Sequence, residues 1–374
     1  MDKTENTKWV RLGDYIEVYD RKNTEGKPYP FFGINKDKAF MPTVADTNEL
    51  DNTKYKVVEN GVFVFNGMHV GRDIAICIAL YAKSNPIIVS PAYTTFKVKD
   101  EAELLPEFLF LQLSREEFGR YGWFLCDASV RGGLDWRRFC DIEIPLPPIE
   151  VQQELVDAYN GIKAIAEQNE ALCQRLSVAC HAYIVDCRAK YDAVPLGDYI
   201  EVYDRKNTDG KPYPFFGINK DKAFMPTVAD TNELDNTKYK VVKKGVFVFS
   251  GMQTGRDICI RIAVYDGEKP ILVSPAYTTF KVKNSSELSP TYLFLQFNRS
   301  ESDRYGWFLS DGSIRSNLDW DRFCDIEIPL PPIEVQQAIV EVFNCAERAK
   351  KIATEARERL KTLCPALIQR AANS

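Results

Sequence analysis

Repeated aspartates are the residues of this chain best suited to acid–base or metal chemistry. Asp127, Asp135 and Asp141 each have a second aspartate 184 residues further along the chain, so a duplicated carboxylate site is one interpretation. Their places beside LDW and FCDIEI are equally typical of turns and helix caps, which is the simpler interpretation. The sequence has no GxGxxG motif after a strand, no Walker A loop and no GxSxG motif. These patterns predict no catalytic residue.

Histidines and cysteines do not form a metal-binding pattern either. Only two histidines are present, and His69 is replaced by Gln253 in the second half of the chain, so a shared catalytic histidine is not expected. The ten cysteines include no CxxC pair, and we expect free thiols in a reducing cytoplasm. Three cysteines recur every seven residues on one predicted helix, a spacing that cannot chelate one metal ion: Cys173, Cys180 and Cys187.

The remaining candidates are basic, amide and aromatic side chains that could bind nucleic acid. Lys and Arg bind phosphates, and Arg and Asn also read base edges in the major groove. In the first half of the chain the candidates are Arg21, Lys22, Asn23, Lys27, Lys36, Arg72, Tyr93 and Arg131. Their counterparts in the second half are Arg205, Lys206, Asn207, Lys211, Lys220, Arg256, Tyr277 and Arg315. Lys38, Arg120 and Trp123 belong to the same segments, although a core position suits Trp123 and Tyr93 and a solvated surface suits any single Lys or Arg.

These candidates occur twice because the chain contains an internal repeat. Residues 12–153 align with residues 196–337 without a gap and differ at 31 of 142 positions. A repeat of this length is a whole duplicated domain. We predict domains at 12–146 and 196–330, each followed by a long helix at 147–190 and 331–374, with a polar tail before residue 12 and a linker at 191–195.

The pattern inside each repeat indicates an α+β domain with an irregular sheet. Four segments of the first repeat are typical of strands: LGDYIEVYD, GVFVFNGM, DIAICIALY and PIIVS. GVFVFNGM alternates like a half-buried strand. ELLPEFLFLQLSREEF is typical of a helix, with Pro106 near its start.

The stretch IPLPPIEVQQ, at Ile144–Gln153 and again at Ile328–Gln337, connects each domain to its long helix. Two adjacent prolines can precede a helix but cannot lie inside one. Glu150 and Glu334 then fall in a first helical turn, where a carboxylate is favourable. Each repeat therefore ends in a junction between a globular domain and a helix.

Heptad patterns in the long helices predict a coiled coil. In the first helix one line is Leu155, Ile162, Asn169, Leu176 and Tyr183, and the other is Ala158, Ile165, Leu172 and Ala179. In the second helix the lines are Ile339, Ala346, Ala353, Leu360 and Leu367, and Val342, Ala349, Ala356 and Leu363. Small residues in the second helix match large ones in the first, which favours packing of the two helices on each other. Antiparallel pairing suits a chain that returns on itself. The alternative is that each helix lies separately on its own domain.

Composition sets only broad limits. The chain has 374 residues, of which 45% are hydrophobic and 27% charged, and it has no apolar run long enough for a membrane span or a signal sequence. The net charge of −5 counts mildly against nucleic-acid binding. A local basic patch would be sufficient for binding, so the total charge does not exclude it.

The chain resembles the specificity (S) subunit of type I restriction–modification systems over nearly its whole length. Its halves open with KWVRLGDYIEV and AVPLGDYIEV and close with LDWRRFCDIEIPLPPIEVQQELV and LDWDRFCDIEIPLPPIEVQQAIV. The resemblance implies a non-catalytic cytoplasmic subunit with pseudo-two-fold symmetry, whose two target-recognition domains each read one half of a split double-stranded DNA site. It implies that antiparallel helices set the gap and dock two methyltransferase subunits, with an endonuclease subunit as a further partner. Adenine methylation with S-adenosylmethionine would occur in the partners, and this chain would bind no cofactor.

The near-identity of the two recognition domains departs from the usual family pattern. Because two-fold protein symmetry is mirrored in the DNA site, we predict an interrupted, near-palindromic target. The differences cluster in two loops, as Asn66/Ser250, His69/Gln253 and Val70/Thr254, and as Gly132/Ser316 and Gly133/Asn317. If these loops contact bases, the half-sites differ at one or two positions. If they contact only backbone, or if the duplication changed no function, the halves are the same.

The alternative function is a duplicated nucleic-acid-binding adaptor or regulator without restriction partners. A subunit should expose apolar helix flanks to its partners, and the candidates for such flanks are Val156, Ile184 and Val185. A free-standing regulator should have polar flanks instead. A hydrolase with duplicated carboxylates is a third hypothesis, and it predicts turnover by the isolated chain with metal.

Overall fold

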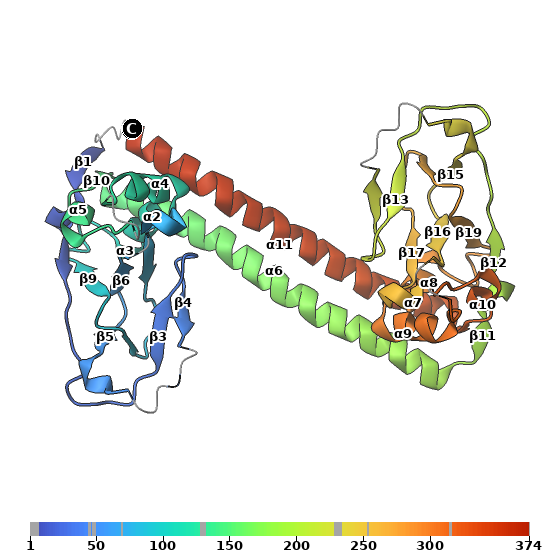
Figure 1. The fold of residues 1–374 in the computed structure, drawn as a ribbon, viewed down its shortest axis with the longest axis horizontal. Coiled ribbons are helices and arrows are strands. Elements are labelled where there is room, and N and C mark those ends of the chain that lie inside the picture. Colours follow the sequence, from blue (N-terminus) through green and yellow to red (C-terminus); the bar gives the residue numbers. More distant parts are fainter. Residues whose placement is uncertain are drawn as a thin grey trace. The chain divides into compact units, whose positions relative to one another are not determined.

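The computed structural model describes residues 7–43, 46, 50–68, 70–127, 132–227, 234–252, 254–313 and 316–373. The chain forms two compact units. Unit 1 consists of Met1–Gln168 and Ile352–Ser374, and unit 2 consists of Asn169–Lys351. Each unit thus combines one repeat with part of each long helix (Figure 1).

The first repeat contains two four-stranded sheets. The antiparallel sheet has the order β2 (Ile16–Val18), β9 (Thr94–Val98), β6 (Phe63–Asn66) and β7 (Cys77–Leu80). The second sheet has the order β4 (Phe40–Pro42), β3 (Phe31–Ile34), β8 (Ile87–Val89) and β5 (Lys56–Val58), and its β3–β8 pair is parallel. A separate antiparallel pair joins β1 (Lys8–Arg11) to β10 (Glu143–Leu146), so part of the segment expected to be a polar tail is a strand.

Short helices complete the first repeat. They are α1 (Leu12–Tyr15), η1 (Asn52–Lys54), α2 (Val70–Asp73), α3 (Pro106–Ser114), α4 (Glu116–Phe124) and α5 (Trp136–Cys140). Pro106 occupies the start of α3, as predicted, but the expected single helix is broken at Arg115. The strand predicted at LGDYIEVYD is confirmed only for Ile16–Val18 (β2), because Leu12–Tyr15 form a helical turn with Leu12 buried in the core cluster.

The second repeat has the same elements. They are β11 (Ala193–Pro195), η2 (Leu196–Asp198), β12 (Ile200–Val202), β13 (Phe216–Ile218), β14 (Phe224–Pro226), η3 (Asn236–Lys238), β15 (Lys240–Val242), β16 (Phe247–Ser250), α7 (Thr254–Asp257), β17 (Arg261–Val264), β18 (Ile271–Val273), β19 (Thr278–Val282), α8 (Pro290–Phe297), α9 (Ser300–Leu309), α10 (Trp320–Cys324) and β20 (Glu327–Pro329). The main sheet has the order β12-β19-β16-β17, and β11 pairs with β20 within what was expected to be a linker. Both repeats are therefore α+β, as predicted.

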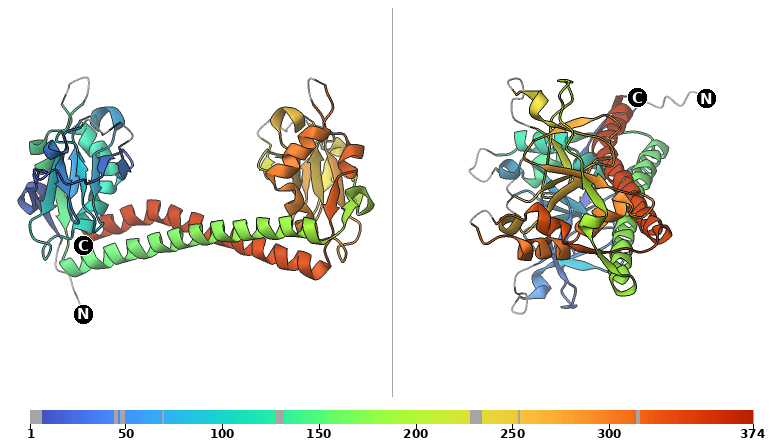
Figure 2. Two further views of the ribbon diagram at one scale, coloured as in Figure 1. Left: turned by 90° about the horizontal axis from the view of Figure 1, so that it is seen from below. Right: turned by 90° about the vertical axis from the view of Figure 1, so that its right-hand side faces the viewer.

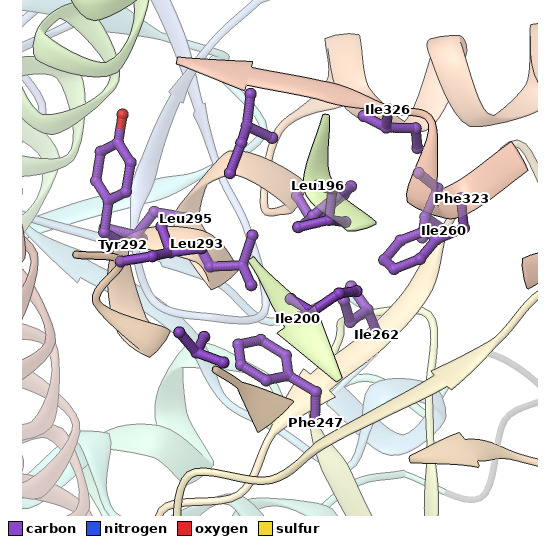
Figure 3. Packing of buried hydrophobic residues seen from close by; sticks show 14 of the residues in the cluster. Leu196, Ile200, Phe247, Ile260, Ile262, Tyr292, Leu293, Leu295, Phe323 and Ile326 are labelled. Carbon is purple, nitrogen blue, oxygen red and sulfur yellow. The ribbon is translucent and has the colours of Figure 1, made fainter. Parts of the chain in front are cut away.

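Each main sheet is buried on both faces. In β6, Phe63 and Phe65 belong to one core cluster, whereas Val64 belongs to a second cluster under the other sheet. The prediction of a half-buried strand was wrong here, because the second sheet covers the face expected to be exposed. Figure 3 shows the corresponding core of the second repeat, where Phe247 packs with Ile200, Ile262 and their neighbours.

A buried glutamine fixes each junction between domain and helix. Gln152 is fully buried; its Oε1 accepts from the Leu105 N–H at 2.9 Å, and its Nε2 donates to the Glu103 and Pro147 carbonyls at 2.9 Å. Gln336 makes the equivalent three bonds at 2.8 Å. The repeated IPLPPIEVQQ therefore orients the first turns of a helix against its own domain.

The long helices are α6 (Ile149–Lys190) and α11 (Ile333–Asn373), each one continuous helix (Figure 2). The prediction for α11 is confirmed at its buried positions, which are Ile339, Ala346, Ala349, Ala353 and Ala356. No helix among the described residues is both long and apolar enough to cross a bilayer.

One of the two heptad lines predicted for α6 was wrong. Ile165 and Leu172 are 47% and 45% exposed, and the buried line is shifted by one residue to Ala166, Cys180 and Cys187. Small alanine and cysteine side chains therefore share the buried part of α6 with Val156 and Ile184.

Within unit 2 the two helices pack antiparallel. Cys180, Ile184 and Cys187 of α6 share a core cluster with Ile339 of α11. Residues 183–191 and residues 334–342 line one groove between the helices. Figure 1 shows α6 and α11 running in opposite directions here. The same cluster contains domain residues, so helix-on-helix and helix-on-domain packing occur together.

Candidate nucleic-acid interface

The predicted DNA-binding residues fall into two groups in each repeat. One group lies in the turn beside β5 or β15, and the other lies where the β3–β4 or β13–β14 hairpin approaches α2 or α7. Within each unit, Figure 1 shows β5 and β15 at the opposite end from α2 and α7.

In the first group the asparagines hold the turn together. Asn23 is buried; its Nδ2 donates to the Lys27 carbonyl at 2.9 Å, and its Oδ1 accepts from the Lys27 N–H at 3.1 Å. Asn207 is equally buried and donates to the Lys211 carbonyl. The side-chain amides of Asn23 and Asn207 are thus bonded inside the turn, and we no longer expect these two residues to contact DNA.

The basic residues of this turn remain exposed, but the two repeats differ around them. Arg21 pairs with Glu59, which also accepts a 2.7 Å hydrogen bond from the Tyr19 hydroxyl. The bond from Tyr19 and the charge of Arg21 hold the pKa of Glu59 below its usual value. Lys243 occupies the Glu59 position in the second repeat, so Arg205, Lys206 and Lys211 lie in a more basic turn there.

Tyr93 and Tyr277 are half-buried and pack against the second core cluster of their repeats. Their backbone carbonyls accept from Lys56 and Lys240, respectively. Both tyrosines therefore have a clear role in packing next to the basic turn.

The second group converges on one carboxylate in the second repeat. The side chain of Asp257 is only 6% exposed and is bonded to Lys220 at 3.2 Å, to Arg256 at 3.4 Å and to Arg261. Burial opposes ionisation, yet the bonds from Lys220 and Arg261 hold the pKa of Asp257 below its usual value. Lys220 and Arg256 are 60% and 58% exposed, so a local charge of +2 is accessible at the surface.

We call Lys220, Arg256, Asp257 and Arg261 the α7 cluster. Sequence reasoning identified Lys220 and Arg256 separately but missed Arg261, because Cys77 stands at its place in the first repeat. Lys36 is exposed at the position equivalent to Lys220. The side chain of Arg72 and the residues Arg131 and Arg315 lie outside the described part of the structure.

Exposed aromatic side chains lie on the helix that packs against α2 or α7. In the first repeat they are Tyr121, Trp123 and Phe124, and in the second they are Tyr305, Trp307 and Phe308. Phe124 and Phe308 are each 78% exposed. Trp123 is therefore a surface residue rather than a core residue, and the repeated RYGWFL segment was the signal for this patch. Contiguous exposed apolar groups of this kind mark interaction surfaces.

The side-chain amines of Lys38 and Lys222 form hydrogen bonds inside their domains rather than extending from the surface. Lys222 is buried and donates to both carboxylate oxygens of Asp303 at 2.7 and 2.8 Å. Gly119 stands at the Asp303 position in the first repeat, and Lys38 donates there to the Leu113 carbonyl at 2.5 Å. Burial lowers the pKa of Lys38 to about 8.

The repeated aspartates have the structural roles expected of turn and cap residues. Asp135 caps α5 by accepting from the Arg138 N–H at 2.9 Å, and Asp127 accepts from the Gly133 N–H at 3.2 Å. Asp141 pairs with Arg11. In the described ranges no group of three or more His, Cys, Asp or Glu side chains is arranged to hold a metal ion.

Two copies of one α+β domain, each continued by a long helix, define a protein with duplicated recognition domains. The chain belongs to the family of the type I restriction modification DNA specificity domain, whose family model matches residues 5–170 and 191–362. Members of this family are DNA-recognition subunits and are not themselves catalytic.

A solved structure agrees with this assignment at the level of the fold. The chain is similar to the S subunit of the type I restriction-modification system from M. genitalium, with 13% identity and a TM-score of 0.61 over 99% of this chain and 98% of that one. It also matches the HsdS subunit from Thermoanaerobacter tengcongensis, with 17% identity and a TM-score of 0.45 over 99% and 97% of the two chains. No curated protein matches the chain.

Proposed function

We propose that this chain is the specificity subunit of a type I restriction–modification complex and that each repeat binds one half of a bipartite DNA target. The observation that supports this most directly is the α7 cluster, in which cations from separate segments surround one buried carboxylate and remain exposed. Fixed, exposed Lys and Arg side chains suit the phosphate contacts that position a protein on duplex DNA. The basic turn at residues 205–211 supplies a second such contact region in the same repeat.

The long helices are proposed to dock two methyltransferase subunits. The expected apolar flanks were partly wrong, because Val156 and Ile184 are buried in their own units, whereas Val185 is exposed. Other apolar side chains take this role, since large hydrophobic residues are exposed on the helices at Ile165, Leu172, Val178, Tyr183, Val185 and Ile352. Such exposure favours a subunit with partners over a free-standing adaptor.

The remaining parts of the proposal follow from the family. Adenine methylation with S-adenosylmethionine would occur in the methyltransferase partners, an endonuclease subunit would join through them, and the complex would act in the cytoplasm. The acidic total charge is compatible with this arrangement because the partners can contribute phosphate-binding surface. The near-identity of the repeats favours an interrupted, near-palindromic target.

The test is purification of the tagged chain from its native cell, with the methylome sequenced in the presence and absence of its gene. We expect a methyltransferase subunit in about two copies per chain and loss of adenine methylation at one split site on deletion. Leu172→Asp should reduce recovery of the methyltransferase subunit, whereas Gln174→Glu, which adds the same charge at an exposed polar position of the same helix, should not. An unchanged methylome with no methyltransferase recovered would favour the adaptor function.

A further inference from the structure

The sequence differences between the repeats meet at one place in the fold. The loop after β6 and the loop before α5 are more than sixty residues apart in the chain, yet the Leu134 N–H donates to the Gly67 carbonyl at 2.8 Å. In the second repeat the Leu318 N–H donates to the Gly251 carbonyl at 2.9 Å, and the Gly255 N–H donates to the Ser316 carbonyl at 2.9 Å. Two clusters of substitutions that are separate in the sequence therefore form one surface region.

The backbone of this region is the same in both repeats, and the side chains differ. Asp127 bonds to the backbone of residue 133, and Asp311 bonds to residue 317 in the same way. Ser250 and Thr254 are buried, and the Thr254 hydroxyl donates to the Gly251 carbonyl, so these two residues shape the loop. Ser316 and Asn317 are partly exposed and replace two glycines, so they are the residues that add polar side-chain groups here.

Ser316 has a left-handed backbone conformation, which is unfavourable for a residue with a side chain. Its φ is +49°, whereas the equivalent Gly132 has φ +56°, which glycine adopts without strain. Non-glycine residues in the left-handed region are strained and concentrate at functional sites. The Ser316 hydroxyl donates to the Asp311 carbonyl at 3.2 Å, a contact that the glycine of the first repeat cannot make.

The position of Ser316 connects it to the proposed interface. A Cβ built on Gly255 would lie 1.9 Å from Ser316 Oγ and 3.1 Å from Trp307 Cδ1, so the serine side chain lies directly over Gly255. The next residue is Arg256 of the α7 cluster, and Trp307 belongs to the exposed aromatic patch. The added polar groups thus adjoin the cations proposed to bind phosphate.

We propose that Ser316 and Asn317 determine a base preference that the first repeat lacks, so the two half-sites differ at one or two positions. Serine and asparagine offer both donors and acceptors, and asparagine pairs in a bidentate manner with the N6 and N7 edge of adenine. Gly132 and Gly133 offer no side-chain group at these places. The target is then an interrupted palindrome whose second half contains an A·T pair that the first half does not require. This inference rests on the proposed function.

The test is selection of binding sites from a randomised duplex pool by the full chain in complex with its methyltransferase subunits. The variants are Ser316→Gly with Asn317→Gly, the reciprocal Gly132→Ser with Gly133→Asn, and Ser316→Gly alone. The control is Glu268→Ser, which also converts a second-repeat residue to its first-repeat counterpart. Glu268 pairs with Lys244, before the start of β16, whereas the loop of interest follows the end of β16.

We expect the wild type to select two halves that differ at one or two positions. The double glycine variant should lose preference there by about tenfold or more, as expected for loss of a bidentate base contact, while all other positions stay unchanged. The reciprocal variant should gain the same preference in the first half. Ser316→Gly removes a strained residue, so its melting temperature should not fall below that of the wild type.

The possible failures are distinguishable. If the wild type selects a split site but the glycine variant selects the identical site, Ser316 and Asn317 do not read a base and only this inference is overturned. Selection of a perfect palindrome by the wild type overturns it as well. If the wild type selects no split site at all, the proposed function fails, and the inference fails with it.

Discussion

Replacing one lysine by methionine is predicted to have opposite effects at equivalent positions of the two repeats. Lys38→Met should stabilise the first repeat, and Lys222→Met should destabilise the second. Both lysines have the same left-handed backbone conformation, with φ of +60° and +59°, so local geometry is matched. Their environments differ because Asp303 faces Lys222 whereas Gly119 stands at that position in the first repeat.

The magnitudes follow from these contacts. Lys222→Met leaves the Asp303 carboxylate, only 17% exposed, without its cation, and loss of one partner of a buried pair costs about 3–5 kcal/mol. In the first repeat the Lys38 amine bonds to a backbone carbonyl rather than a carboxylate, and its pKa is lowered to about 8 by burial, from an ordinary value of 10.5. At roughly 1.4 kcal/mol per pKa unit, the lowered pKa corresponds to a desolvation cost of about 3 kcal/mol for the charged Lys38 amine. Partial exposure of the side chain reduces this cost to about 2 kcal/mol.

The pH dependence has a defined sign. Between pH 8 and 10.5 the unfolded chain binds more protons at Lys38 than the folded chain does, so stability of the first repeat rises with pH in this window. The penalty is fully present below pH 8 and is relieved as the amine deprotonates. Lys38→Met should abolish this contribution, and Gly119→Asp should also abolish it by supplying the missing carboxylate.

Hydrogen-exchange mass spectrometry of the full chain can follow the two repeats separately, because peptides that contain the differing positions identify each one. The readout is the free energy of opening of each core between pH 7 and 10. Equal destabilisation by Lys38→Met and Lys222→Met would refute the reasoning, since it would mean that Lys38 stabilises the fold as a charged group. A pH profile unchanged by Lys38→Met would refute the assignment of the titration to this amine.

Five further substitutions test the junctions, the DNA-binding surface and the helices. Gln152→Met and Gln336→Met should each lower the free energy of unfolding by about 2–4 kcal/mol in denaturant titrations, because a buried side chain loses its three hydrogen bonds to the backbone. A loss under about 1 kcal/mol would show that these bonds do not hold the junction. Arg256→Gln should reduce the slope of log binding constant against log salt by about 1, as for loss of one phosphate contact, and an unchanged slope would place Arg256 away from DNA. Ala166→Leu should destabilise unit 1 by about 1–3 kcal/mol in thermal unfolding, because it overpacks a fully buried position. Leu172→Ala, at an exposed position, should change stability by less than about 1 kcal/mol while weakening methyltransferase binding.

The duplication, the junctions and the long helices were readable from the sequence alone. Sequence identity over 142 positions implies one fold built twice, and adjacent prolines followed by an apolar heptad define a helix start whatever the tertiary context. The buried line of α11 was predicted correctly because its alanines and aliphatic residues follow a single heptad pattern.

The buried face of α6 was decided only by tertiary structure. Val156 packs on the first domain, and Ile184 packs with the second domain and α11, so this helix buries more than one face along its length. A heptad pattern cannot say which of two adjacent apolar lines meets a domain and which meets solvent. The heptad pattern therefore places Leu172 in the interior although it is exposed, and it leaves out Cys180 although it is buried.

The role of each polar residue likewise depends on contacts with residues that are distant in the sequence. Asn23 was expected to read DNA and instead holds a turn, and Lys222 was separated from Asp303 by 81 residues before folding brought them together. Lys220 and Arg256 are separate candidates in the sequence, and the structure brings them together in the α7 cluster because both pair with Asp257. Composition and spacing determine which side chains are available, but whether a charge is exposed, paired or buried depends on neighbours from other segments, and only the folded chain supplies those.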